Sequence, residues 1–319
     1  MSSKNQSYVR AEQYLAPETL AQLAPLELRA KMIVEGVMSG MHRSPYQGMA
    51  VEFAQHRQYV PGDDLKHLDW KVYGRSDKLT IKQFQQETNL DILLLVDASA
   101  SMGFGSLDIK RGWGGTKASE KTKTWTKFDH ATAIATAVSF LCLHQQDRVG
   151  LVTYNSELQT MVQRSNSQGQ WHRILNSLST VPVGEKTNLV KLTDQALSKI
   201  RNKALFVIIS DFFESPEAIQ QALARFKHRQ KDVMLFQILD NQEIQFPFMR
   251  DAAFQGLESE GRVRVDPKAL RNAYLEVLAN HIEKISLIAG QFGFSHTVFD
   301  SHKSVGPAIS KILVRRSAL

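Results

Sequence analysis

From Asp91 onward the sequence alternates short apolar runs with segments of helical periodicity, and this alternation constrains the fold more than any other feature. The apolar runs span residues 91–97, 148–155, 204–211 and 232–240. The segments between them, such as 128–146 and 216–229, space their apolar residues as an amphipathic or buried helix does. Apolar strands separated by helices are typical of a mostly parallel sheet with helices on both faces. Residues 89–319 are therefore predicted to form one α/β domain.

Several further segments of this domain have recognisable patterns. Residues 158–163 are predicted to form an edge strand, and residues 243–265 an inserted hairpin with Glu260 and Gly261 at its tip. A helix over 267–290, a strand over 294–300 and a closing helix complete the domain. Directly after the first strand comes an insert, residues 103–127, whose basic part from Lys110 to Lys127 has the Gly, Thr and Lys content of a solvated loop.

Residues 1–88 have a different pattern and are predicted to form a small module of helices and strands. Residues 17–41 place Leu, Ile, Val and Met at helical intervals, so one or two amphipathic helices are expected there. Two β-like runs, residues 51–60 and 78–85, flank a turn at Pro-Gly-Asp-Asp. The module is too small for a large core of its own, so we expect Trp70 to be a buried anchor that joins it to the α/β domain.

Polar side chains follow two of the apolar strands. Asp97, Ser99 and Ser101 end the first strand and Asp211 ends the run 204–211, whereas Thr187 precedes a predicted helix that begins near Asn188. Ligands of open α/β sheets bind beyond the carboxyl ends of the strands. Two carboxylates and three hydroxyls are hard oxygen donors, which suit Mg²⁺ or Mn²⁺. Each of these residues taken alone is explained equally well as a helix cap or a turn residue. Because all three loops are predicted to lie at the same edge of the sheet, we favour a metal site.

The same residues carry a resemblance to known families. Asp97, Ser99 and Ser101, followed by Thr187 and Asp211, resemble the metal-ion-dependent adhesion site of von Willebrand factor A domains. A second motif resembles a bacterial family called domain of unknown function 58, and it comprises Glu52, Phe53, Arg57, Tyr59, Gly62, Asp63 and Asp64, then Leu68, Asp69, Trp70 and Arg75. The resemblance implies a von Willebrand factor A-like α/β fold and a protein-interaction adaptor, which works with a MoxR-type AAA+ ATPase. It also implies that the hydroxyls contact the metal, that the aspartates act largely through water, and that a partner carboxylate completes the site.

Enzymatic alternatives lack their motifs. A phosphatase of the haloacid dehalogenase type needs a second aspartate where Ser99 stands. The chain has no G-x-S-x-G, and Glu185 interrupts the only sequence that approaches a P-loop. We therefore expect no catalytic turnover, with a metal-dependent hydrolase that uses Asp97 and Asp211 as the alternative. His42, His56 and His67 match no ligand spacing and are interpreted as ordinary surface or hydrogen-bonding residues.

Composition narrows the remaining classes of function. The net charge of +7 and pI of 9.4 suggest nucleic-acid binding, but the basic residues are spread along the chain and mixed with acids. A nucleic-acid-binding protein that uses the 110–127 insert is therefore the less favoured alternative. The single cysteine, Cys142, fits a reducing compartment, and no apolar segment reaches the length of a membrane span. We expect a cytoplasmic protein with no membrane partner.

Overall fold

A computed structural model describes most of the chain. The described residues are 53–60, 68–84, 90–108, 116–200, 204–248, 252–255, 262–265, 267–307 and 311. They fall into two compact units, one within residues 41–89 and one that begins at Leu90. The predicted helices over 17–41 lie outside the described residues, as do Glu52, Gly62, Asp63 and Asp64 of the N-terminal motif.

The smaller unit contains a pair of antiparallel strands and one helix. Its elements are β1 (Phe53–Gln58), α4 (Trp70–Ser76) and β2 (Thr80–Phe84). The strands confirm the two predicted β runs. Asp69 begins α4, because its carboxylate accepts hydrogen bonds from the backbone N–H groups of Lys71 and Val72 at 3.0 and 3.2 Å. Within this unit the Trp70 side chain is not buried, so its role as an anchor to the α/β domain stays a prediction.

The larger unit is built on one six-stranded sheet. Its strands are β3 (Asp91–Asp97), β6 (Arg148–Tyr154), β7 (Leu158–Ser165), β8 (Leu205–Ser210), β9 (Asp232–Leu239) and β12 (Ser295–Asp300). Their spatial order is β12-β9-β8-β3-β6-β7. All neighbours are parallel except β6 and β7, so β7 is an antiparallel edge strand, as predicted. Counted along the chain, this is the doubly wound order 3-2-1-4-5-6.

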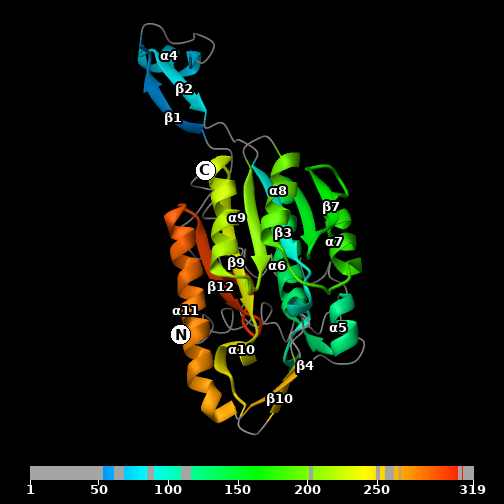
Figure 1. The fold of residues 1–319 in the computed structure, drawn as a ribbon. Coiled ribbons are helices and arrows are strands. Elements are labelled where there is room, and N and C mark those ends of the chain that lie inside the picture. Colours follow the sequence, from blue (N-terminus) through cyan, green and yellow to red (C-terminus); the bar gives the residue numbers. More distant parts are fainter. Residues whose placement is uncertain are drawn as a thin grey trace, which may run out of the picture. The chain divides into compact units, whose positions relative to one another are not determined.

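Helices cover both faces of this sheet (Figure 1). One face is covered by α6 (Lys127–His144) and α7 (Gln170–Thr180), and the other by α8 (Leu189–Lys199), α9 (Pro216–His228) and α11 (Pro267–Gln291). The strands are buried because they contact helices on both sides: Leu93 and Leu95 of β3 pack in one core cluster with Leu192 of α8 and Phe226 of α9. The predicted fold class, a mostly parallel α/β sheet with helices on both faces and a small N-terminal module, is confirmed.

The insert that follows β3 is more ordered than its composition indicates. The 3₁₀ turn η2 (Ala100–Gly103) leads into it, and it includes β4 (Leu107–Asp108), α5 (Lys117–Thr122) and β5 (Thr124–Trp125). The prediction of a solvated loop is wrong for the end of the insert, because the side chains of Trp125, Thr126 and Lys127 are buried. Thr126 caps α6 in a reciprocal capping box with Asp129, which fixes where that helix begins.

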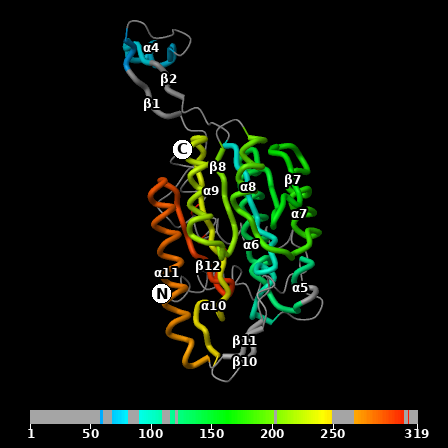
Figure 2. Tube along the Cα trace, in the orientation of Figure 1, coloured from blue at the N-terminus to red at the C-terminus, as the bar shows by residue number. Residues whose placement is uncertain are grey.

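The hairpin predicted over 243–265 has its first strand only from Ala252 onward, because the start of the predicted segment is helical. It consists of β10 (Ala252–Gln255) and β11 (Arg262–Val265), which pair antiparallel, and its predicted tip lies outside the described residues. A short helix that the sequence pattern did not indicate, α10 (Asn241–Gln245), precedes it. The trace in Figure 2 shows α10 at the end of the sheet where β9 finishes. None of the helices that the structure describes combines the length and the hydropathy of a membrane span.

Candidate metal centre

The predicted site lies at the point where the sheet changes its winding direction. β3 is the central strand, hydrogen-bonded to β6 on one side and to β8 on the other. Chain connections leave these strands in opposite directions, so the carboxyl ends of β3 and β8 border the crevice in which doubly wound folds bind ligands. Asp97 ends β3, and Asp211 directly follows β8.

The carboxylate of Asp97 is buried and fully engaged by hydrogen bonds. Oδ1 accepts from the backbone N–H of Ser99 at 2.8 Å, and Oδ2 accepts from the Ser210 hydroxyl at 2.6 Å. Ser99 and Ser101 point toward each other, with their hydroxyl oxygens 3.1 Å apart. One serine therefore donates to the other, and the acceptor keeps lone pairs for a further ligand.

The loop that carries Thr187 is tied to the β3 loop through backbone hydrogen bonds. Gly184 N–H donates to the carbonyl of Ala98 at 3.0 Å, and Ala100 N–H donates to the carbonyl of Glu185 at 2.8 Å. Asn188, rather than Thr187, caps α8, because the Asn188 side chain accepts from Lys191 N–H at 2.9 Å. The Thr187 hydroxyl is buried and has no hydrogen-bond partner. Capping therefore does not account for Thr187.

Asp211 contacts a residue that the sequence analysis did not assign to the site. Lys127, the first residue of α6, places its Nζ 2.8 Å from Asp211 Oδ2 and 2.7 Å from Glu243 Oε1 of α10. The second oxygen of Asp211, Oδ1, is buried without a partner. No local signal identifies these contacts, since Lys127 is 84 residues from Asp211 and 116 residues from Glu243 in the sequence.

Burial and mutual repulsion shift the ionisation of these groups. Burial, with the neighbouring charge of Asp211, raises the pKa of Asp97 from 3.8 to about 7, although hydrogen bonds from Ser210 and Ser99 oppose this shift. Burial alone would lower the pKa of Lys127, but the Asp211 and Glu243 carboxylates outweigh burial and hold that pKa above its usual value. Burial raises the pKa of Glu243, which the Lys127 charge partly offsets. The site thus contains excess carboxylate charge around one buried ammonium.

The residues present fit a small divalent cation. Thr187 Oγ1 and Asp211 Oδ1 are buried oxygens without partners, and buried polar atoms in native proteins normally have one. Together with the Ser99 and Ser101 hydroxyls they form an all-oxygen donor set of the kind Mg²⁺ and Mn²⁺ prefer. Within the described ranges, no group of three or more His, Cys, Asp or Glu side chains is placed to hold a metal, so this hydroxyl-rich set remains the candidate.

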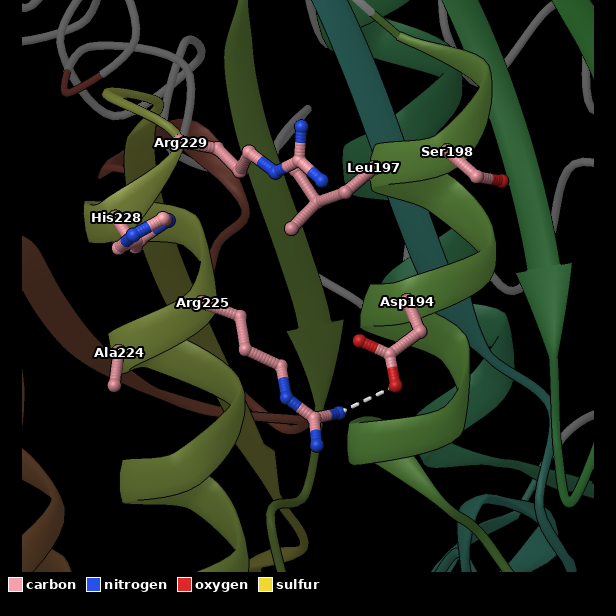
Figure 3. Close-up of a pocket in the computed structure, with 7 residues that line it drawn as sticks. All are labelled: Asp194, Leu197, Ser198, Ala224, Arg225, His228 and Arg229. Atoms are coloured by element: carbon pink, nitrogen blue, oxygen red, sulfur yellow. Dashed lines mark hydrogen bonds and ion pairs between the residues drawn. The ribbon is translucent and has the colours of Figure 1, made fainter.

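A separate pocket lies on the helical surface, between α8 and α9 (Figure 3). Arg225 of α9 and Asp194 of α8 form an ion pair in it, with 2.6 Å between Arg225 Nη1 and Asp194 Oδ2. Arg225 Nη1 also donates to the carbonyl of Val190. These contacts join two neighbouring helices. The pocket shares no lining residue with the crevice at Asp97 and Asp211.

Comparison with known proteins places the chain in a family. Residues 55–284 match the family described as protein of unknown function DUF58. Uncharacterized proteins of Mycobacterium tuberculosis and Mycobacterium bovis are each 30% identical to it over 271 residues, which is 83% of this chain and 79% of each relative. The conserved hypothetical protein BatB from Bacteroides thetaiotaomicron overlaps 72% of this chain and 100% of its own, with 11% identity and a TM-score of 0.45. The VWA domain of SpRpn10 overlaps 70% and 95%, with 10% identity and a TM-score of 0.41. On the family match and the mycobacterial relatives, the chain belongs to the DUF58 family.

Proposed function

We propose that this chain is a metal-dependent protein-interaction adaptor. The observation that carries the proposal is the pair of buried, unpartnered oxygens, Thr187 Oγ1 in the loop that is hydrogen-bonded to the β3 loop, and Asp211 Oδ1 directly after β8. Buried oxygens without partners are costly unless a ligand satisfies them. A bound Mg²⁺ or Mn²⁺ is the ligand that their chemistry favours.

Each residue has a distinct role in this proposal. Ser99, Ser101 and Thr187 provide neutral hydroxyls that hold the cation directly, while Asp97 and Asp211 balance its charge through bound water. Because most of the direct ligands are neutral, the cation keeps enough positive charge to attract one carboxylate from outside. A Glu or Asp side chain of a partner protein would supply that carboxylate.

The hydrogen bonds of Asp97 support an adaptor over a hydrolase. An aspartate nucleophile needs an oxygen that can approach a substrate. Both oxygens of Asp97 already accept hydrogen bonds, and the carboxylate is fully buried. Asp211 shares one oxygen with the Lys127 ammonium. The bonding of Asp97 therefore supports an adaptor, whereas Asp211 keeps the unpartnered oxygen Oδ1, which the proposal assigns to the cation site.

The partner that we propose is a MoxR-type AAA+ ATPase, together with a client protein that the pair helps to assemble or mature. The support for this partner is the family resemblance of the N-terminal motif. In this arrangement ATP is hydrolysed by the partner, and this chain contributes the cation-dependent contact.

Capture of a purified MoxR-type ATPase from the same genome, with and without Mg²⁺, tests the proposal. Wild-type protein should retain the ATPase in Mg²⁺ and release it in EDTA, and Thr187→Ala should abolish retention while the fold stays intact. Thr193→Ala is a matched control, because Thr193 is a buried threonine of α8 whose hydroxyl donates to the carbonyl of Leu189 at 2.8 Å. Retention that ignores both EDTA and Thr187→Ala would refute the adaptor. Turnover of phosphoesters by the isolated chain that Asp97→Asn eliminates would establish the hydrolase instead.

A further inference from the structure

Lys127 places a permanent positive charge beside the proposed cation site. Its side chain is fully buried, and Nζ also lies 4.6 Å from the centre of the Phe213 ring, in addition to its contacts with Asp211 and Glu243. Burying an ammonium is costly unless carboxylates compensate for it. The carboxylates of Asp211 and Glu243 compensate for the charge here, so the surroundings of Lys127 Nζ stabilise a cation.

The surroundings hold the ammonium in place. Glu243 Oε1 receives Lys127, while Glu243 Oε2 accepts from the backbone N–H of Asp240 at 2.8 Å in a capping box of α10. Asp240 in turn accepts from the hydroxyl of Ser301 at 2.8 Å and from Ser106 N–H at 3.1 Å. Both oxygens of Glu243 are engaged by hydrogen bonds, so the Glu243 side chain is fixed in position. The Lys127 ammonium is therefore held beside Asp211.

The charge balance of the site depends on this lysine. Asp211 and Glu243 contribute two carboxylates against the one ammonium of Lys127. With a divalent cation bound, these three side chains and the ion carry a net positive charge, which attracts an incoming carboxylate. Without the ammonium the same cation would only neutralise the two carboxylates, and the attraction would be weaker.

We propose that Lys127 is a specificity-determining residue that acts on the two ligands of the site in opposite directions. Its ammonium weakens binding of the divalent cation, because it occupies one oxygen of Asp211 and repels a second positive charge. It strengthens binding of the partner carboxylate, because it cancels the charge of Glu243. This inference rests on the proposed function, since both ligands belong to the same cation site.

The first experiment is a titration of Mn²⁺ into wild type, Lys127→Met and Lys127→Arg by isothermal calorimetry at fixed pH. Lys127→Met should bind Mn²⁺ about 10–100-fold more tightly than wild type, the range by which residues around a metal change its affinity. Lys127→Arg keeps the charge and should remain close to wild type. If Lys127→Met fails to fold, Glu243→Gln replaces it and should change the affinity in the other direction, about tenfold weaker, because it removes a negative charge.

The second experiment adds acetate to each Mn²⁺ complex and measures the relaxation rate of the water protons. This rate falls when acetate displaces a water molecule from the ion. Acetate should displace water in wild type and Lys127→Arg, and should fail to do so at the same concentration in Lys127→Met. Glu243→Gln should bind acetate at least as well as wild type.

The outcomes separate this inference from the proposed function. Equal or weaker Mn²⁺ binding by folded Lys127→Met, with normal binding by wild type, would overturn the role of Lys127 and leave the adaptor standing. If Lys127→Met binds Mn²⁺ and wild type does not, the conclusion that Lys127 weakens metal binding would stand, but the proposal that the wild-type site binds a cation would be refuted. Absence of binding in every variant would overturn both.

Discussion

Replacing Asp97 by asparagine should remove a pH-dependent loss of stability that the buried carboxyl imposes on the wild-type protein. In the folded protein the pKa of Asp97 is raised from 3.8 to about 7, mainly by burial and then by the charge of Asp211. The folded state therefore holds a proton that the unfolded state has already released. Stability falls with rising pH wherever the folded state binds more protons.

The size of the effect follows from that pKa difference. A rise of about three units, at about 1.4 kcal/mol per unit, amounts to at most about 4 kcal/mol. This contribution is fully present below pH 3.8 and is lost as the pH rises through about 7. Asparagine is always neutral and retains an oxygen for Ser99 N–H and an amide group for Ser210, so Asp97→Asn should match wild type near pH 4 and exceed it above pH 7.

Urea denaturation at pH steps between 4 and 8.5, without divalent cations, measures the difference between the two proteins. Comparing wild type with Asp97→Asn cancels the contributions of other groups, including the buried His130 and His296, whose pKa values are both lowered to about 4 by burial. Saturating Mg²⁺ should raise the stability of wild type at pH 8 and leave Asp97→Asn nearly unchanged, because the cation stabilises the ionised form. A constant difference between the proteins across the pH range would refute the reasoning.

Three further predictions concern residues outside the donor set. Trp70→Ala should cost about 3–5 kcal/mol in urea denaturation if the side chain is the predicted anchor to the α/β domain, because α4 does not bury it within its own unit; little change would show that Trp70 is no anchor. His130→Phe should reduce the loss of folding stability that wild type shows as the pH falls from 6.5 toward 4. Burial lowers the pKa of His130 in the folded protein, so the unfolded chain accepts a proton in this pH range that the folded protein does not. An unchanged loss of stability between pH 6.5 and 4 would mean that His130 is not its cause. Gly105→Ala should cost about 1–3 kcal/mol by overpacking, because its Cβ would clash with the carbonyl oxygen of Trp125, whereas Gly290→Ala meets open space and should be neutral or stabilising.

The sheet was predictable from the sequence because its strands are buried on both faces. Residues 91–97 were predicted as a strand from their continuous apolar run, and β3 spans Asp91–Asp97. The edge strand β7 could be separated from the others because residues 158–163 mix polar with apolar side chains instead of forming a continuous apolar run, as expected of a strand that is partly exposed to solvent. Position in the sheet is thus encoded locally, in the hydrophobic pattern of each strand.

The contacts of Lys127 could not be predicted because they are encoded only in the fold. In the sequence, Lys127 ends a run of polar and basic residues that has the composition of a solvated loop. Its burial depends on where α6 begins, which the capping box of Thr126 and Asp129 determines, and on α10, a five-residue helix too short for a periodic pattern. The composition of a segment indicates its average exposure, whereas the burial of a single lysine depends on the residues that contact it in the fold.

These contacts also make the described part of the insert a component of the site. Lys127 N–H donates to the carbonyl of Phe104 at 2.8 Å, so the two ends of the insert meet directly beyond β3. Within α5, Ser119 donates its hydroxyl to Asp129 at 3.0 Å, and Asp129 belongs to the same first turn of α6 as Lys127. A displacement of α5 would therefore disturb that turn and, through Lys127, the carboxylate of Asp211.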